Sequence, residues 1–158
     1  MSEPELHELA ARIGFLLGTW QGAGKGEYPT IDPFSFEEEI RFTHNGKPFL
    51  AYAQRTWHPD KKFAMHAETG YYRPLDGGGI EIVIAQPTGI IEIQEGTIEG
   101  GVIRTESTLV AKTTTAKEVT QLERSLEVDG DTLRYEVRMA AVGQPLQHHL
   151  SAELKRVG

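Results

Sequence analysis

Hydrophobic and polar residues alternate in short runs from Gly18 almost to the end of the chain. This alternation is typical of β-strands with one buried face, and turn-forming residues separate the runs. Sequences such as "HNGK" at 44–47 and "DGD" at 129–131 predict hairpins that join consecutive strands. We expect ten strands, over residues 18–28, 36–44, 47–57, 63–73, 80–86, 89–95, 102–110, 119–128, 131–141 and 146–157.

The N-terminal residues follow a different pattern, which predicts a helix over residues 2–17. Apolar residues recur there at helical spacing, at Leu6, Leu9, Ile13 and Leu17. Ser2 and Glu5 have the spacing of a capping box, and Pro4 suits the first helical turn. We expect this helix to plug or flank the strands.

Ten consecutive antiparallel strands are too many for one exposed sheet. Closure into an up-and-down barrel removes the sheet edges, so we predict an all-β, ten-stranded antiparallel barrel with a short N-terminal helix. A β-sandwich is the alternative, but the chain lacks the long connection of a Greek key. The 158 residues contain no linker, repeat or low-complexity tract, which indicates one domain over residues 1–158.

Alternation also indicates which side chains point into the barrel. Three strands carry apolar residues on one face, at Phe34, Phe36, Ile40 and Phe42, at Ile80, Ile82 and Ile84, and at Leu133, Tyr135, Val137 and Met139. Gln86 lies on the same face as the three isoleucines and is polar. A barrel of about ten strands is wide enough to enclose one ligand.

The first strand, "GTWQGAGKGEYP" at 18–29, is rich in glycine, although each glycine within a strand costs about 0.5–1 kcal/mol relative to alanine. Its even-numbered residues share one face and include Gly18, Trp20, Gly22 and Gly24. The glycines either permit strong curvature where the barrel closes or leave space for a bulky ligand. The segment lacks the spacing of a nucleotide-binding loop, and Pro29 prevents a following helix, so we predict no nucleotide site.

Composition limits the classes of partner. The formal net charge is −7 and the basic residues are scattered, which argues against nucleic acid and anionic membranes. Zero cysteines exclude disulfides and thiolate catalysis. The chain has no apolar run of about 18 residues and no signal-like start, so we expect a cytoplasmic protein that binds small molecules.

Histidines are the main candidates for chemistry, because no motif pairs a nucleophile with a base. His66 shares a strand face with Glu68, which favours a hydrogen-bonded histidine inside the barrel. His148 and His149 open the last strand, and strict alternation turns only one of them inward. Because His148 shares its face with Leu150 and other apolar residues, alternation favours His148. An enzyme with these residues would depend on a bound cofactor.

Several blocks of the chain resemble the nitrobindins, a family of small haem-binding β-barrels. The blocks are "LLGTWQGAGKGEYPTI", "EEEIRFTHNGKPFLAYAQRTW", "MHAETGYYRP", "VIAQPTGIIEIQEGT" and "GQPLQHHLSAELKR". The first contains the family signature G-x-W-x-G-x-G-x-G-x-Y-P. The resemblance extends from Leu16 to Arg156 and is strongest to mycobacterial and other actinobacterial members.

The resemblance implies one haem b per chain near one mouth of the barrel, with His149 as the axial ligand of the ferric iron. The family motif L-x-x-H-L thus selects His149, and a β-bulge would reconcile this with the alternation. Further cofactor-binding positions implied by the resemblance are Met65, His66, Gln86 and Met139, with Thr30 and Lys117 at the haem edge or propionates.

The activity implied by the resemblance is isomerisation of peroxynitrite to nitrate at the ferric haem, together with binding of nitric oxide. Two alternatives stay open at this point. One is a carrier of an apolar ligand, similar to fatty-acid-binding proteins or lipocalins, and the other is a haem or nitric oxide carrier without turnover. The sequence also leaves open whether the barrel forms a homodimer.

Overall fold

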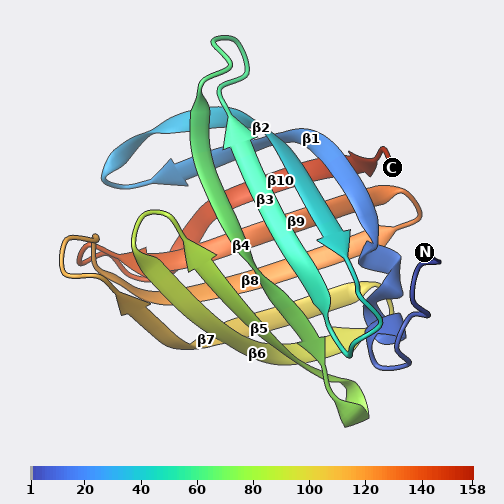
Figure 1. Ribbon diagram of the computed structural model, residues 1–158. Coiled ribbons are helices and arrows are strands. Elements are labelled where there is room, and N and C mark those ends of the chain that lie inside the picture. Colours follow the sequence, from blue (N-terminus) through green and yellow to red (C-terminus); the bar gives the residue numbers. More distant parts are fainter. Residues whose placement is uncertain (1) are drawn as a thin grey trace.

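The computed structural model describes residues 2–158, and its strands form one closed antiparallel barrel (Figure 1). Each strand pairs with its neighbours in the sequence, and the first pairs with the last, so the predicted up-and-down barrel is confirmed and the sandwich is wrong. The strands are β1 (Gly18–Tyr28), β2 (Ile31–Thr43), β3 (Leu50–Trp57), β4 (Ala64–Pro74), β5 (Gly79–Gln86), β6 (Ile90–Glu99), β7 (Val102–Lys112), β8 (Val119–Asp129), β9 (Thr132–Ala141) and β10 (Gln147–Arg156).

The helix predicted over residues 2–17 is wrong in extent and type. The structure has a short 3-10 helix, η1 (Ala10–Leu16), and residues 2–7 are not helical. The predicted capping box does not form, and the His7 Nδ1 atom instead accepts a hydrogen bond of 3.0 Å from the Leu9 N–H. Packing of Leu6 and the buried face of η1 against the barrel outweighs the local capping signal. A second 3-10 turn, η2 (Asp76–Gly78), precedes β5.

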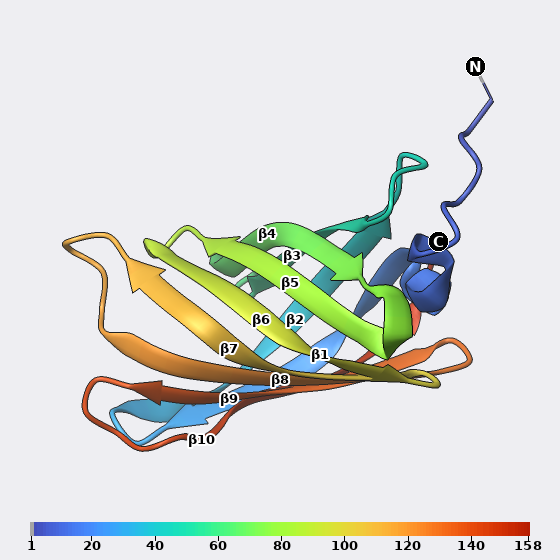
Figure 2. The same cartoon turned by 90° about the horizontal axis from the view of Figure 1, so that it is seen from below.

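The helix η1 covers one end of the barrel, as Figure 2 shows. The Trp20 indole N–H donates to the Leu16 carbonyl at 2.8 Å, and the Arg156 guanidinium lies 4.2 Å from the centre of the Trp20 ring. Arg156 also donates to the carbonyls of Phe15 and Leu17. These contacts fix η1 to both the first and the last strand, and they close this end of the barrel.

The glycines of β1 allow close packing rather than leaving space. An added Cβ at Gly22 would lie 2.7 Å from Leu154 Cα, and one at Gly24 would overlap the Phe36 ring and lie 2.6 Å from the Ser151 carbonyl oxygen. The Phe34 ring covers Gly26 in the same way. The interpretation that the glycines make room for a ligand is therefore wrong, because aromatic rings and the β10 backbone fill that space.

The predicted inward faces of the three apolar strands are confirmed. Phe36, Ile40, Phe42, Ile80, Ile82, Ile84, Leu133 and Val137 are all buried. Several buried residues between them are polar, and they are Glu38, Gln54, Thr56, Glu68, Glu92, Gln94 and Thr105. The barrel interior is therefore apolar near η1 and partly polar around its middle.

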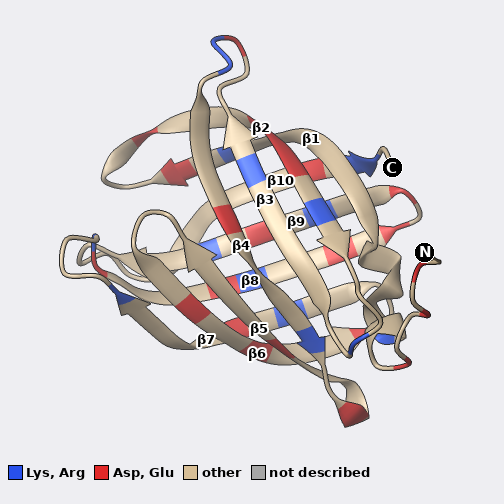
Figure 3. Cartoon of the chain, viewed as in Figure 1, with Lys and Arg blue, Asp and Glu red and all other residues tan. Residues whose placement is uncertain are grey.

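Charged residues of both signs are distributed along the strands (Figure 3). The Arg73–Glu81 pair at 2.8 Å and the Arg134–Glu153 pair at 2.8 Å are examples of ion pairs between neighbouring strands. Among the described residues 2–158, no helix is both long and apolar enough to cross a bilayer.

Substitution of Gly22 by alanine tests the packing of β1 against β10. We expect Gly22→Ala to lower the free energy of unfolding by about 1–3 kcal/mol, because the new methyl group meets backbone atoms of β10. Gly14→Ala is the control, since its Cβ would lie 3.5 Å from Leu6, an ordinary contact. Urea unfolding measures both, and equal stabilities would contradict the close packing.

Candidate functional site

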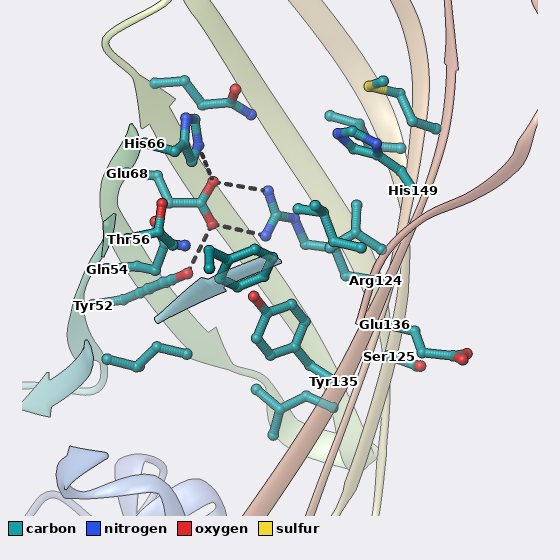
Figure 4. A pocket seen from close by; sticks show the side chains of 18 of the residues that line it. Tyr52, Gln54, Thr56, His66, Glu68, Arg124, Ser125, Tyr135, Glu136 and His149 are labelled. Atoms are coloured by element: carbon teal, nitrogen blue, oxygen red, sulfur yellow. Dashed lines mark hydrogen bonds and ion pairs between the residues drawn. The ribbon is translucent and has the colours of Figure 1, made fainter. Parts of the chain in front are cut away.

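A cavity of about 270 Å³ extends from the middle of the barrel toward the end opposite η1. Apolar residues make up part of its wall, and they include Phe34, Phe36, Ile40, Phe42, Val137 and Leu150. Polar residues make up the rest, and Figure 4 shows side chains such as Glu68, Arg124 and Tyr135 projecting from different strands toward a common centre, whereas Ser125 and Glu136 point away from it. The site is therefore an apolar pocket with a few convergent polar groups, as expected for a small-molecule site.

Most of the cofactor-binding residues predicted from the sequence meet at this cavity. Its lining includes Met65, His66, Gln86, Met139 and His149, which come from four different strands and from the same end of the barrel. Thr30 and Lys117 do not line it. Both are exposed, in the β1–β2 turn and in the connection between β7 and β8, which lie at the barrel end away from η1 (Figure 2).

A β-bulge decides which of the two adjacent histidines faces the cavity. The register between β10 and β9 shifts between His148 and Leu150, so that both His149 and Leu150 line the cavity. The His148 Nδ1 atom lies 3.0 Å from the Glu27 carboxylate on the outside. Strict alternation, which favoured His148 as the inward residue, is wrong here because the bulge adds one residue to β10.

The end of β1 holds the imidazole ring of His149. The His149 Nδ1 atom lies 3.0 Å from the Glu27 carbonyl oxygen, and since a carbonyl can only accept, Nδ1 carries the proton. The Tyr28 ring packs edge-on against the imidazole, with 5.5 Å between ring centres. The Tyr28 hydroxyl is in turn fixed, because it accepts the Ala141 N–H at 2.9 Å and donates to the Met139 carbonyl at 3.1 Å.

This arrangement leaves His149 in the form that binds metal ions. Burial lowers the pKa of His149, and this effect outweighs that of the hydrogen bond to Glu27, which raises the pKa. The lowered pKa favours the neutral imidazole ring. With the proton on Nδ1, the Nε2 atom has a free lone pair. A neutral imidazole whose second nitrogen donates to a backbone carbonyl is a common metal ligand, so the residues present fit a single-histidine haem site.

Deeper in the cavity than His66 and His149, Arg124 is held between two buried carboxylates (Figure 4). Its Nε and Nη1 atoms donate to Glu92 at 2.6 Å and to Glu68 at 2.8 Å. The Tyr52 hydroxyl donates to Glu68 at 2.7 Å, and the His66 Nε2 atom lies 3.3 Å from the same carboxylate. The expectation of a hydrogen-bonded histidine inside the barrel is confirmed for His66, which also lines the cavity.

Arg124 determines the ionisation of Glu68. Burial alone would raise the pKa of Glu68, but the guanidinium and the hydrogen bonds from His66 and Arg124 hold this pKa well below its usual range. The pKa of Arg124 is likewise raised, because attraction to Glu68 and Glu92 outweighs the effect of burial. Both partners are therefore charged, and the ion pair is fully formed at neutral pH.

Glu38 has a different environment in the same interior. The Tyr135 hydroxyl donates to it at 2.7 Å and the Gln54 Nε2 atom at 2.6 Å. Burial raises the pKa of Glu38 to about 7, although these two hydrogen bonds act in the opposite direction. The Gln54 Oε1 atom has no hydrogen-bond partner within the part of the chain that the structure describes.

Sequence reasoning missed most of these buried charges. Glu38 shares its strand face with Phe36 and Ile40, and Glu92 shares its face with Ile90, so alternation alone indicates that both point inward. Arg124 shares its strand face with Leu122 and Leu126, which are both buried, so alternation points it inward as well. Only the closed barrel shows that it lies between Glu68 and Glu92.

Removal of the guanidinium tests the role of this ion pair. We expect Arg124→Met to lower the free energy of unfolding by about 3–5 kcal/mol at neutral pH, because it leaves Glu68 and Glu92 buried without a cation. Arg138→Met is the matched control in the next strand, since its pair with Glu123 is half exposed and contributes at most about 1 kcal/mol.

The pH dependence of the same variant provides a second readout. A carboxyl with a lowered folded pKa stabilises the protein above its unfolded pKa of about 4.3 and loses this effect as the pH falls. The deficit of Arg124→Met should therefore be largest at neutral pH and shrink in acid. Chemical denaturation measured at several pH values checks this, and a deficit equal to that of Arg138→Met would contradict it.

Comparisons with known proteins agree with this geometry. A family model described as a THAP4-like, heme-binding beta-barrel domain matches residues 10–156. The peroxynitrite isomerase of Nocardia farcinica is 51% identical, covering 99% of this chain and 98% of its own, and peroxynitrite isomerase 2 of Mycobacterium marinum is 54% identical, covering 96% and 97%.

Solved structures give the same result at the level of the fold. The crystal structure of Rv2717c from M. tuberculosis matches with a TM-score of 0.92 and 46% identity, covering 98% of this chain and all of that one. The resemblance to nitrobindins in the sequence is thereby confirmed. The chain belongs to the family of THAP4-like, heme-binding β-barrel domains.

Proposed function

We propose that this protein binds one haem b in the cavity, isomerises peroxynitrite to nitrate at the ferric iron, and binds nitric oxide at the same iron. The relatives named peroxynitrite isomerase, at 51% and 54% identity over nearly the whole chain, support the reaction. The observation that carries the proposal is the β-bulge that turns His149 into the cavity with its Nδ1 bound to a backbone carbonyl.

The residues of the cavity would perform distinct tasks. His149 would hold the iron through Nε2, and Glu27 and Tyr28 fix the direction of that atom. Bound there, the haem would supply an iron with one coordination position open to a small ligand. Apolar side chains such as Phe36 and Val137 exclude water from this space.

His66 lies on the wall opposite His149, as Figure 4 shows. Because Glu68 is ionised and only accepts hydrogen bonds, the proton of a neutral His66 ring lies on Nε2, where it donates to this carboxylate. Thr30 and Lys117 are proposed to contact the haem edge and propionates from the exposed connections at this end, where a lysine ammonium can pair with a carboxylate.

A carrier of acidic lipids is the weaker alternative. A buried fatty-acid carboxylate needs a cationic partner, and the guanidinium that lines this cavity is already bound by Glu68 and Glu92. A carrier of an uncharged apolar ligand would not need the contacts with Glu27 and Tyr28 that orient the His149 ring. A haem or nitric oxide carrier without turnover uses the same residues, and only kinetics can separate it from an isomerase.

Two adjacent histidines provide a matched test of haem binding. We expect His149→Ala to lack the wild-type Soret band that forms when haem is added to the purified protein, because the imidazole that the Glu27 carbonyl orients is removed. His148→Ala should keep the band, since His148 pairs with Glu27 on the outside. Loss of the band in His148→Ala and its retention in His149→Ala would show that the ligand is assigned to the wrong residue.

Stopped-flow kinetics test the reaction itself. The haem-loaded protein should accelerate the decay of peroxynitrite and raise the yield of nitrate, whereas the haem-free protein should leave both unchanged. The haem-free protein is the matched control, because it has the same chain and the same cavity. Equal decay rates for the two forms would contradict the proposed isomerase activity. The protein would then be a haem or nitric oxide carrier without turnover.

A further inference from the structure

The chain has five tyrosines, and their side chains lie in different surroundings. Tyr71 is 49% exposed on the outside of the barrel. Tyr28 donates to backbone carbonyls, and Tyr72 is buried against the rings of Phe42 and Tyr52. Tyr52, Tyr72 and Tyr135 line the cavity, and two of them, Tyr52 and Tyr135, each donate to a buried carboxylate.

The carboxylate bonded to Tyr135 is well suited to accept a proton. The Tyr135 hydroxyl lies 2.7 Å from Glu38 Oε1 and 2.9 Å from Oε2, within the range for direct proton transfer. Glu38 is fully buried, and among residues 2–158 no lysine, arginine or histidine forms an ion pair with it. Burial without a cation raises the pKa of Glu38 to about 7.

The carboxylate bonded to Tyr52 is the opposite case. Glu68 receives the Arg124 guanidinium at 2.8 Å, and this cation together with the hydrogen bond from His66 holds the pKa of Glu68 low despite its burial. A carboxylate with so low a pKa is a weak base. Tyr52 and Tyr135 therefore have the same hydrogen-bond length to carboxylates of very different basicity.

This difference matters for one-electron oxidation. A phenol that loses an electron becomes strongly acidic, so its proton has to leave with the electron, and a base at hydrogen-bond distance makes this possible. Burial and the neighbouring Glu38 both raise the pKa of Tyr135, so its hydroxyl keeps its proton at neutral pH. Oxidation therefore starts from the neutral phenol and not from a tyrosinate ion.

We propose that Tyr135 is the residue oxidised and nitrated by nitrogen dioxide that enters the cavity, with Glu38 as the proton acceptor. One electron passes from the phenol to nitrogen dioxide, which becomes nitrite, while the hydroxyl proton moves to Glu38 and leaves a neutral phenoxyl radical. A second nitrogen dioxide then forms a C–N bond beside the phenol oxygen, and the displaced ring proton returns to that oxygen as 3-nitrotyrosine.

The proposal rests on the proposed function only for the source of the oxidant. Peroxynitrous acid releases nitrogen dioxide when its O–O bond breaks homolytically, and a peroxynitrite-handling cavity would meet this product. Nitrogen dioxide is small and uncharged, so the apolar walls at Phe36 and Val137 do not oppose its entry. Tyr135 lies deeper than His66 and His149 in the same cavity (Figure 4).

The reaction should depend on pH through Glu38. The groups that face this carboxyl are Tyr135 from β9, Gln54 from β3, and Glu68 and His66 from β4, with Arg124 of β8 acting through Glu68. Since the pKa of Glu38 is raised to about 7, the group holds a proton below this pH and cannot accept another. Nitration of Tyr135 should therefore increase as the pH rises through 7.

The test exposes haem-free protein to nitrogen dioxide generated from nitrite by pulse radiolysis, and measures 3-nitrotyrosine at each tyrosine by mass spectrometry. Tyr135 and the exposed Tyr71 should be labelled, and Tyr52 should not. Glu38→Gln should lower the label at Tyr135 by about tenfold or more and leave Tyr71 unchanged, because an amide takes up no proton. Tyr52→Phe is the matched control and should leave the label at Tyr135 unchanged.

Two results would overturn the proposal: equal labelling of Tyr52 and Tyr135, or a Tyr135 label that is the same in Glu38→Gln as in the wild type. If Glu38→Gln does not fold, the wild-type ratio of Tyr135 to Tyr71 label decides, because it should rise from about pH 6 to about pH 8 and a constant ratio contradicts the role of Glu38. Since no haem is present, failure of the isomerase leaves this test unaffected.

Discussion

Closure of the sheet through the pairing of β1 with β10 is the constraint on which the other features depend. The backbones approach so closely there that Gly22 has no room for a Cβ. The same pairing places the end of β1 beside the start of β10, where the Glu27 carbonyl and the Tyr28 ring meet His149. The glycine-rich strand thus serves the cavity indirectly, because it closes the barrel and orients the histidine.

The interior combines this closed apolar wall with buried charges in two contrasting settings. Glu68 and Glu92 share the Arg124 guanidinium, which compensates for much of the cost of removing charges from water. Within residues 2–158, Glu38 receives hydrogen bonds from Tyr135 and Gln54 but forms no ion pair, and burial therefore raises its pKa to about 7. One barrel therefore holds an ionised carboxylate, Glu68, and a carboxylate that titrates near neutrality, Glu38, and this gives Tyr52 and Tyr135 different chemistry.

The strands and their inward faces could be predicted from the sequence, because alternation is a local pattern that the barrel preserves. Three expectations failed where contacts distant in sequence decide the outcome. The helix over 2–17 gave way to packing on the barrel end, the space beside the glycines is filled by Phe34 and Phe36, and the bulge before Leu150 reverses the alternation at His148. Arg124 was missed because its partners lie on β4 and β6, far away in the chain.

The proposed function depends most on the His149 imidazole, the group that would hold a haem iron in this cavity. Chemical rescue tests it directly, with haem titrated into His149→Gly in the absence and presence of free imidazole. We expect the variant to bind haem without the wild-type absorption spectrum. Free imidazole, which can occupy the space left by the side chain, should restore that spectrum. A wild-type spectrum in His149→Gly without imidazole would contradict this role of His149.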